Sequence, residues 1–192
     1  MIKQIIILSS LLFANVILYS QTSLIDAIRN FKPKEAIELI KSGEDVNAYL
    51  SHKENHEHSH NCSGHDYNKS PLFWSILRSY YEVADLLIQK EANINSENAH
   101  GKTPLHMAVL RYDYRMIELL LINKADINKK DDQNNTPIML ALYSSEIENN
   151  LIIKNQIINT IKLLIDNNAD LNIKNNLNKR PIDFKIIKEL TH

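Results

Sequence analysis

A short motif that contains proline followed by an aliphatic residue recurs along the chain and indicates that one structural unit is repeated. A Ser, Thr or Arg precedes the proline in the four copies, Ser70-Pro71-Leu72, Thr103-Pro104-Leu105, Thr136-Pro137-Ile138 and Arg180-Pro181-Ile182. The spacings between copies are 33, 33 and 44 residues, and a fixed period of this size is typical of solenoids built from stacked repeats. Because stacked units form an extended surface rather than an enclosed cleft, the pattern favours binding over catalysis.

A second motif, an Asp or Asn two residues before an Asn, recurs with the first. Its copies are Asp45-Val46-Asn47, Asn93-Ile94-Asn95, Asp126-Ile127-Asn128 and Asp170-Leu171-Asn172. The last Asn precedes the next proline motif by 8 residues in three copies and by 23 residues in the first. The chain is therefore one unit copied four times, with a first insertion in segment 51–66 and a second insertion around 143–158.

Each unit is predicted to contain a helix, a tight turn, a second helix and an extended hairpin. Proline suits the first turn of a helix because its missing N–H has no partner there, and the Ser or Thr before it is a natural N-cap. The residue two positions before each motif is of a type that tolerates left-handed backbone, namely Asn68, Gly101, Asn134 and Asn178. Residues 23–47 are expected to form an irregular opening repeat, and residues 180–192 a partial closing one.

The segment Gly101-Lys102-Thr103-Pro104-Leu105-His106-Met107-Ala108 resembles the signature strip of the ankyrin repeat. The resemblance covers roughly residues 23–190 and implies an all-α solenoid of helix-turn-helix units with β-hairpin loops, made of four repeats plus a partial C-terminal cap. It also implies that His106 orders the turn through hydrogen bonds. Phe73, Met139 and Asp183 replace this His in other copies.

Glu91 and Lys124 stand where Gly43 ends the second helix of the first repeat. We predict left-handed backbone at both positions, at a cost relative to Gly.

The resemblance implies that the first helices and hairpin tips bind another protein. The positions expected to face outward include six apolar or aromatic residues, Trp74, Leu77, Met107, Leu110, Leu140 and Tyr143. A contiguous exposed apolar patch is typical of interaction sites, whereas the alternative is that Trp74 and Met107 pack against neighbouring repeats. No nucleophile–base pair is apparent, and three glycines offer little material for a phosphate loop, so we expect a monomeric binder that is not an enzyme and requires no cofactor.

Residues 1–20 are predicted to be a secretory signal peptide that precedes an ankyrin-repeat domain at 21–192. Lys3 is followed by an apolar run from Ile5 to Leu18, and Ser20 is the small residue expected at the cleavage site. An uncleaved membrane anchor is the alternative. Removing the leader leaves 21 basic and 23 acidic residues, which disfavours a nucleic-acid partner. We expect a periplasmic or secreted protein with no membrane association after cleavage.

The first insertion, 51–66, is rich in metal-ligating side chains: His52, His56, His58, His60, Cys62 and His65. In an extended segment, alternate positions project from one face about 6.5–7 Å apart, and imidazole and thiolate are favoured ligands of zinc, copper and nickel. The sequence leaves two functions open. One is an inhibitor or immunity-type protein that covers a toxic partner. The other is a periplasmic metal-handling protein. For the segment itself, the alternative is a solvated loop that binds no metal specifically.

The second insertion, around Tyr143 to Ile158, is predicted to be helical. The added length corresponds to about three turns of α-helix, so the two flanking helices can lengthen in phase. Its role as an extra partner contact or as family drift is left open.

Overall fold

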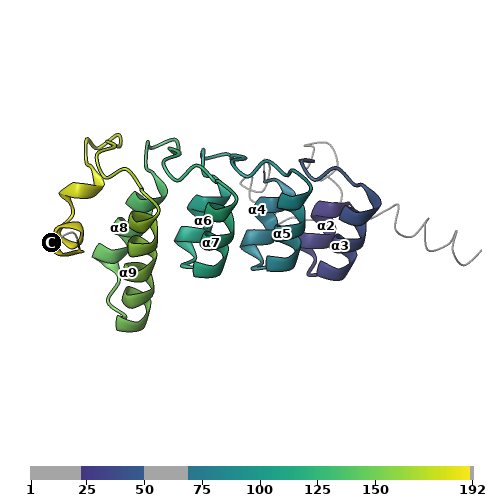
Figure 1. Cartoon of the computed structure of the whole chain (residues 1–192), viewed down its shortest axis with the longest axis horizontal. Helices are drawn as coiled ribbons and strands as arrows, with labels where there is room; N and C mark the ends of the chain where they lie inside the picture. Colours follow the sequence, from purple (N-terminus) through teal and green to yellow (C-terminus); the bar gives the residue numbers. More distant parts are fainter. Residues whose placement is uncertain (1–22, 50–68, 191–192) are drawn as a thin grey trace, which may run out of the picture.

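A computed structural model describes residues 23–49 and 69–190, and in these ranges the chain forms a row of helix pairs. The pairs are α2 (Leu24–Arg29) with α3 (Pro33–Ser42), α4 (Pro71–Leu77) with α5 (Tyr81–Gln89), α6 (Pro104–Leu110) with α7 (Tyr114–Ile122), and α8 (Pro137–Ile147) with α9 (Leu151–Asp166). A 3-10 helix, η1 (Pro181–Asp183), and α10 (Lys185–Leu190) follow. Figure 1 shows the pairs side by side, with the connecting loops along one edge. The predicted all-α solenoid of four repeats and a partial cap is confirmed.

The first helices begin where the proline motif predicts. Ser70 and Thr103 have extended backbone, and their side-chain oxygens accept hydrogen bonds from the N–H groups of Phe73 and His106. Thr136 has the same backbone but makes no side-chain cap, and its buried hydroxyl has no partner among the described residues. In the preceding repeat the His106 ring bonds to the Thr103 hydroxyl, whereas Met139 stands at the position that matches His106 and offers no such nitrogen to Thr136.

The second helices end as predicted, in a left-handed residue. Glu91 (φ 64°), Lys124 (φ 65°) and Asn168 (φ 65°) occupy the place of Gly43 (φ 97°). The next residue is a buried alanine in the last three repeats, whose N–H turns back to a carbonyl of the helix, as from Ala92 to Leu87 O at 3.0 Å. This is the bond pattern of a Schellman cap, in which a small buried residue completes the turn.

The loops contain tight hairpin turns but no β-strand within the described ranges, which corrects the predicted β-hairpins. Each turn contains two backbone bonds. One runs from the N–H groups of Asn98, Asp131 and Asn175 to the carbonyls of Lys102, Asn135 and Lys179. The other runs from the N–H groups of Gly101, Asn134 and Asn178 back to the carbonyls of Asn98, Asp131 and Asn175. Both bonds lie within the turn, and no ladder of strand bonds continues from them in the described ranges. Gly101 (φ 66°), Asn134 (φ 56°) and Asn178 (φ 58°) have the predicted left-handed backbone, and Asn68 lies outside the described residues.

A ladder of asparagine side chains joins each repeat to the next and explains the second motif. The Asn47, Asn95 and Asn128 Oδ1 atoms accept hydrogen bonds from the N–H groups of Asn93, Asp126 and Asp170, at 2.7, 2.9 and 2.8 Å. The first residue of each motif folds the loop locally, since its side chain accepts from the N–H two residues later, as from Asn128 to Asp126 Oδ1 at 2.9 Å. One residue of the motif therefore forms the turn, and the other stacks the repeats.

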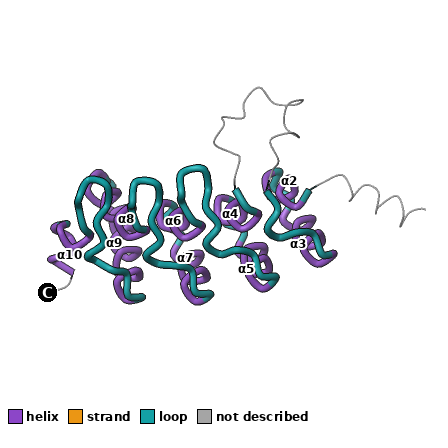
Figure 2. Tube along the Cα trace, turned by 90° about the horizontal axis from the view of Figure 1, so that it is seen from above, coloured by secondary structure: helices purple, strands orange, loops and turns teal. Residues whose placement is uncertain are grey.

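A continuous apolar core runs through the stack from Leu24 to Ile187. It lies between two layers, because Figure 2 shows the first helix of each pair in one row and the second helix in another. Leu72 and Ile76 of α4, and Leu87 of α5, are fully buried in this core. One helix pair cannot enclose its own apolar side chains, so the neighbouring repeats cover the rest of their surface and complete the core.

The second insertion lengthens the two helices of its repeat, as predicted, and the loop between them covers residues 148–150. Helix α8 has 11 residues against 7 in α6, and α9 has 16 against 9 in α7, so the two helices absorb the whole insertion. Figure 1 shows α9 extending beyond the other helices on the edge away from the loops. Three aliphatic side chains are exposed at this end of the helix pair: Ile147 (80 % exposed) at the end of α8, and Leu151 (72 %) and Ile152 (73 %) at the start of α9.

The partial cap covers the last repeat. Asp183, which stands where the signature has His, accepts from the Arg180 backbone N–H at 2.8 Å and pairs with its guanidinium at 2.7 Å. Hydrogen bonding to Arg180 lowers the pKa of Asp183. Within the described ranges, none of the helices is long and apolar enough to cross a membrane.

Candidate interaction face

The first helices and the hairpin loops form one face of the solenoid. Figure 2 shows the loops projecting beyond the row of α2, α4, α6 and α8. All six residues predicted for the partner site belong to these helices: Trp74 and Leu77 to α4, Met107 and Leu110 to α6, Leu140 and Tyr143 to α8. The structure therefore places the predicted residues on one row of helices.

The predicted contiguous exposed apolar patch is wrong in its simple form. Trp74 is only 6 % exposed, and the other five residues are half-buried. Leu77, Met107 and Tyr143 are partly buried and pack against the core. For Trp74, the alternative of packing against neighbours is the correct one.

A hollow of about 300 Å³ lies at the C-terminal half of this face, between α8 and two successive hairpin loops. Leu140 and Tyr143 line it from the helix. The loops contribute the remaining lining residues, Gln133, Asn135, Asn175, Asn176 and Leu177. Leu177 is 70 % exposed, so the hollow combines apolar surface with a rim of side-chain amides.

Buried and partly buried hydrogen bonds hold the walls of this hollow. The Asn175 amide nitrogen donates to the Tyr143 hydroxyl at 2.8 Å and to Asn135 Oδ1 at 2.8 Å. Its Oδ1 accepts from the N–H groups of Leu177 and Lys179. The Tyr143 ring also meets Phe184 edge to face, with centroids 5.2 Å apart. Since every polar atom of the buried Asn175 side chain is used, the geometry is rigid before any partner arrives.

His106 continues this network into the preceding repeat. Its Nε2 lies 3.1 Å from the Asn135 carbonyl, which can only accept, so Nε2 carries the proton. Its Nδ1 accepts from the Thr103 backbone N–H at 3.1 Å. Burial lowers the pKa of this histidine, and the neutral ring suits both bonds. The predicted role of His106 in ordering the turn is confirmed.

Asp131 anchors the loop beside it. Burial alone would raise the pKa of this carboxyl group, but hydrogen bonds from the Lys102 ammonium and from the Asn135 and Gln133 N–H groups outweigh it, so the pKa is lowered. The Lys102 Nζ lies 2.9 Å from Asp131 Oδ2.

The sequence analysis did not predict the loop residues that line the hollow. A third recurring pattern could have indicated them, since Asn98, Asp131 and Asn175 are spaced by 33 and 44 residues. Each of these side chains folds its loop by accepting hydrogen bonds from the N–H groups two and four residues later. The lining residue Leu177 sits on the loop that Asn175 folds.

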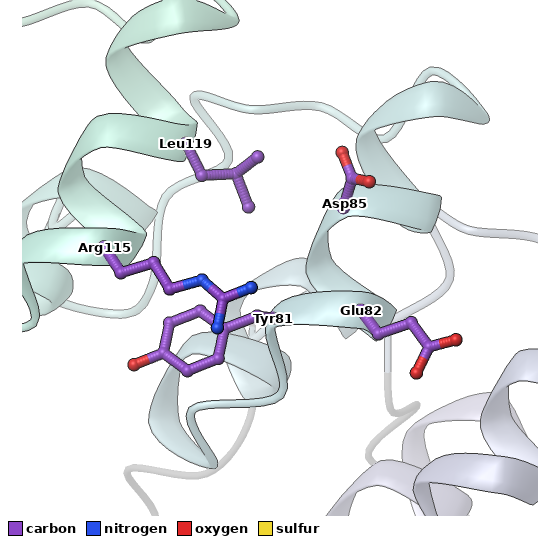
Figure 3. Close-up of a pocket in the computed structure, with 5 residues that line it drawn as sticks. All are labelled: Tyr81, Glu82, Asp85, Arg115 and Leu119. Atoms are coloured by element: carbon purple, nitrogen blue, oxygen red, sulfur yellow. The ribbon is translucent and has the colours of Figure 1, made fainter.

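A second hollow, of about 370 Å³, lies between the second helices α5 and α7. Figure 3 shows the Arg115 guanidinium over the Tyr81 ring, with Asp85 and Leu119 across the space. The Tyr81 hydroxyl donates to Asp113, which also caps α7 by accepting from the Met116 N–H. Burial and the Asp113 hydrogen bond raise the pKa of Tyr81, so the phenol stays protonated and serves to position the start of α7.

The residues predicted to ligate a metal ion, within 51–66, lie outside the described residues. In the part of the chain that the structure describes, no group of three or more His, Cys, Asp or Glu side chains is placed to hold a metal ion.

Comparison with known proteins agrees with the helix pairs and the loops. A family model described as ankyrin repeats (3 copies) matches residues 24–131 and 98–175. A search of curated proteins found no match. Ankyrin-repeat proteins are generally non-catalytic interaction modules, and their repeats imply binding to another protein. Because the family model matches most of its length and the helix pairs repeat with the same geometry, this chain belongs to the ankyrin repeat family.

Proposed function

We propose that this protein is an exported inhibitor or immunity-type protein that covers a partner protein with its loop-bearing face. The observation that carries the proposal is the rigid hollow formed by Leu140, Tyr143 and Leu177 with its amide rim. Preorganised apolar pockets at the centre of an interface take up the anchor side chains that dominate binding energy. At the rim, Gln133 Oε1 already accepts from Asn135 Nδ2, so the Gln133 Nε2 group is the one that can donate to the backbone of a partner.

Export is part of the proposal and is supported by the sequence of residues 1–20. The order of Lys3, an apolar run and Ser20 is that of a cleaved signal peptide. We place the mature protein, residues 21–192, in the periplasm or outside the cell.

The experiment compares partner capture by proteins that differ at one exposed leucine or isoleucine. Immobilised wild-type protein is incubated with cell-envelope extract beside Leu177→Asp, which puts a charge at the edge of the hollow. Ile122→Asp is the matched control, because Ile122 is 79 % exposed at the end of α7, away from the hollow. A protein retained by wild type and Ile122→Asp, and lost with Leu177→Asp, supports the hollow as the anchor site. Equal retention by all three proteins contradicts it.

A metal-handling role is the second candidate, and the run of histidines in 51–66 favours it. In this function His52, His56, His58, His60, Cys62 and His65 supply ligands for zinc, copper or nickel. Deleting the segment separates the two candidates, since metal handling needs it and a protein that only binds a partner through the hollow does not.

A further inference from the structure

Three cationic side chains surround Trp74, the single tryptophan of the chain. The Arg29 and Arg78 guanidinium carbons lie 5.2 and 5.9 Å from the centroid of the Trp74 ring, and the Lys69 ammonium lies 4.8 Å from it. They come from α2, from the end of α4 and from the residue before Ser70. The cluster lies on the first helices, at the opposite end of the same row from the hollow at Leu140 (Figure 2).

Two buried donors in this cluster have no acceptor among the described residues. Trp74 Nε1 and Arg78 Nε are both shielded from solvent, and neither makes a hydrogen bond within that part of the chain. The rest of the Arg78 group is held in place, because its Nη2 donates to the Arg29 carbonyl at 2.9 Å and its guanidinium lies 4.0 Å from the Phe31 ring centroid. Buried donors in proteins are nearly always paired, so two of them at the same ring mark a place for a missing acceptor.

Within the described ranges, the charge of the two arginines is also incompletely balanced. Among the described residues, the carboxylate that pairs with either arginine is Asp26, 3.9 Å from Arg29 Nη1, and both side chains are partly exposed. Arginine presents fixed N–H groups that match the two oxygens of a carboxylate. An anionic acceptor would therefore satisfy both the orphaned donors and the charge.

We propose that the Trp74 cluster, defined as Arg29, Lys69, Trp74 and Arg78, binds a carboxylate side chain on an acidic segment of the partner protein. The carboxylate accepts from Trp74 Nε1 and Arg78 Nε once the Arg29 and Lys69 side chains, which lie over the ring, move aside. This inference rests on the proposed function, since it adds the chemistry of the partner to the same face.

The cluster is specific to this repeat. Met107 and Leu140 occupy the position of Trp74 in the next two repeats and carry no N–H group on their side chains. Arg111 ends α6 as Arg78 ends α4, but it is exposed. A carboxylate is favoured over a nucleic-acid phosphate because the whole chain has a net charge of −1, with no basic stripe to follow a phosphate backbone.

The test uses the fluorescence of Trp74, the one tryptophan in the sequence. The purified protein is titrated with an end-blocked hexaglutamate peptide, a hexaglutamine peptide and a thymidine hexanucleotide. We expect a saturable change with hexaglutamate alone, which weakens as salt is raised because the attraction is electrostatic. Arg78→Gln should weaken hexaglutamate binding about tenfold, whereas the matched control Arg111→Gln should leave it unchanged. Arg29→Gln is the second variant if the melting curve of Arg78→Gln shows loss of folding.

Equal responses to the glutamate and glutamine peptides would overturn the inference, and so would equal losses in the Arg78 and Arg111 variants. Tighter binding of the hexanucleotide would replace the acidic segment with nucleic acid. The two proposals fail separately. Loss of peptide binding with hollow-dependent capture intact removes this inference alone, whereas peptide binding without hollow-dependent capture removes the proposed function alone.

Discussion

The side chain of Asn128 accepts a hydrogen bond of 2.8 Å from the backbone N–H of Asp170, 42 residues later in the chain. The bond spans the lengthened repeat, so the insertion in α8 and α9 leaves the stacking of the loops unchanged. Asn95 makes the matching bond to Asp126 one repeat earlier. Each of these side chains joins two repeats by a hydrogen bond to its Oδ1 atom, and the repeats share no strand pairing within the described ranges.

Asn95→Ala and Asn128→Ala should each lower the free energy of unfolding by about 1 kcal/mol, the usual net value of one hydrogen bond. Asn159→Ala is the control, because Asn159 is exposed in the interior of α9, where alanine is the better helix former. Urea unfolding measures all three variants. If Asn128→Ala proves as stable as Asn159→Ala, the ladder contributes nothing to stacking.

Glu91→Gly and Lys124→Gly should each raise stability by about 0.5–1 kcal/mol, because left-handed backbone costs a residue with a Cβ atom more than it costs glycine. Both residues have this backbone, with φ of 64° and 65°. For a chain of this size the melting temperature should rise by about 2–4 °C per kcal/mol.

Glu118→Gly supplies the opposite control for these two variants. Glu118 is exposed inside α7, where glycine should cost about 1 kcal/mol. Lower melting temperatures for all three glycine variants would show that the left-handed turns carry no strain.

Much of this architecture could be predicted from the sequence because its signals are local. Proline at the first helical turn, Gly43 at a helix end and the spacing of Asp126 and Asn128 each report a backbone conformation within a few residues. The period then places the copies in register. The lengthening of the helices around the second insertion also followed from local chemistry, since the added length corresponds to about three helical turns.

The site was less predictable because exposure depends on contacts between repeats. The position of Trp74 within its repeat predicts an exposed side chain. In the structure, Arg29 of the previous repeat and Arg78 at the end of its own helix lie over the ring, and Trp74 is buried. The hollow at Tyr143 depends on Asn175, 32 residues away, which bonds its hydroxyl. The contacts of Arg29 with Trp74 and of Asn175 with Tyr143 each join two different repeats, so the sequence of a single repeat does not predict them.

The free energy of unfolding should decrease as pH is lowered below about 6.5, because of the titration of His106. Burial lowers the pKa of His106 from its ordinary value of 6.5, so the unfolded chain takes up a proton first as pH falls, and the stability present above 6.5 is lost toward the lower folded pKa. Thermal melts of wild type and His106→Gln at about pH 7.5 and about pH 5.5 measure this. The wild type should lose more melting temperature than the variant. An equal loss in both proteins would assign the pH dependence to other groups.

The exported protein should begin at Gln21, because Ser20 closes the apolar run of the leader. Intact-mass analysis of protein recovered from the cell envelope measures the N-terminus. A chain that retains Met1 in the membrane fraction would show that the leader remains as an anchor.

The His-rich segment should bind about one zinc or copper ion through His56, His58 and His60, with Cys62 or His52 as a fourth ligand. Alternation brings these side chains to one face of an extended segment, and the ligands must lose their protons to bind, so affinity should decrease as pH falls through the imidazole range near about 6.5. Calorimetry on wild type and on the triple variant His56→Ala, His58→Ala, His60→Ala measures the site. Saturable binding in wild type, lost in the triple variant and weakened at low pH, would support metal handling. Weak uptake that does not saturate in either protein would leave the hollow at Tyr143 as the functional site and remove the metal candidate.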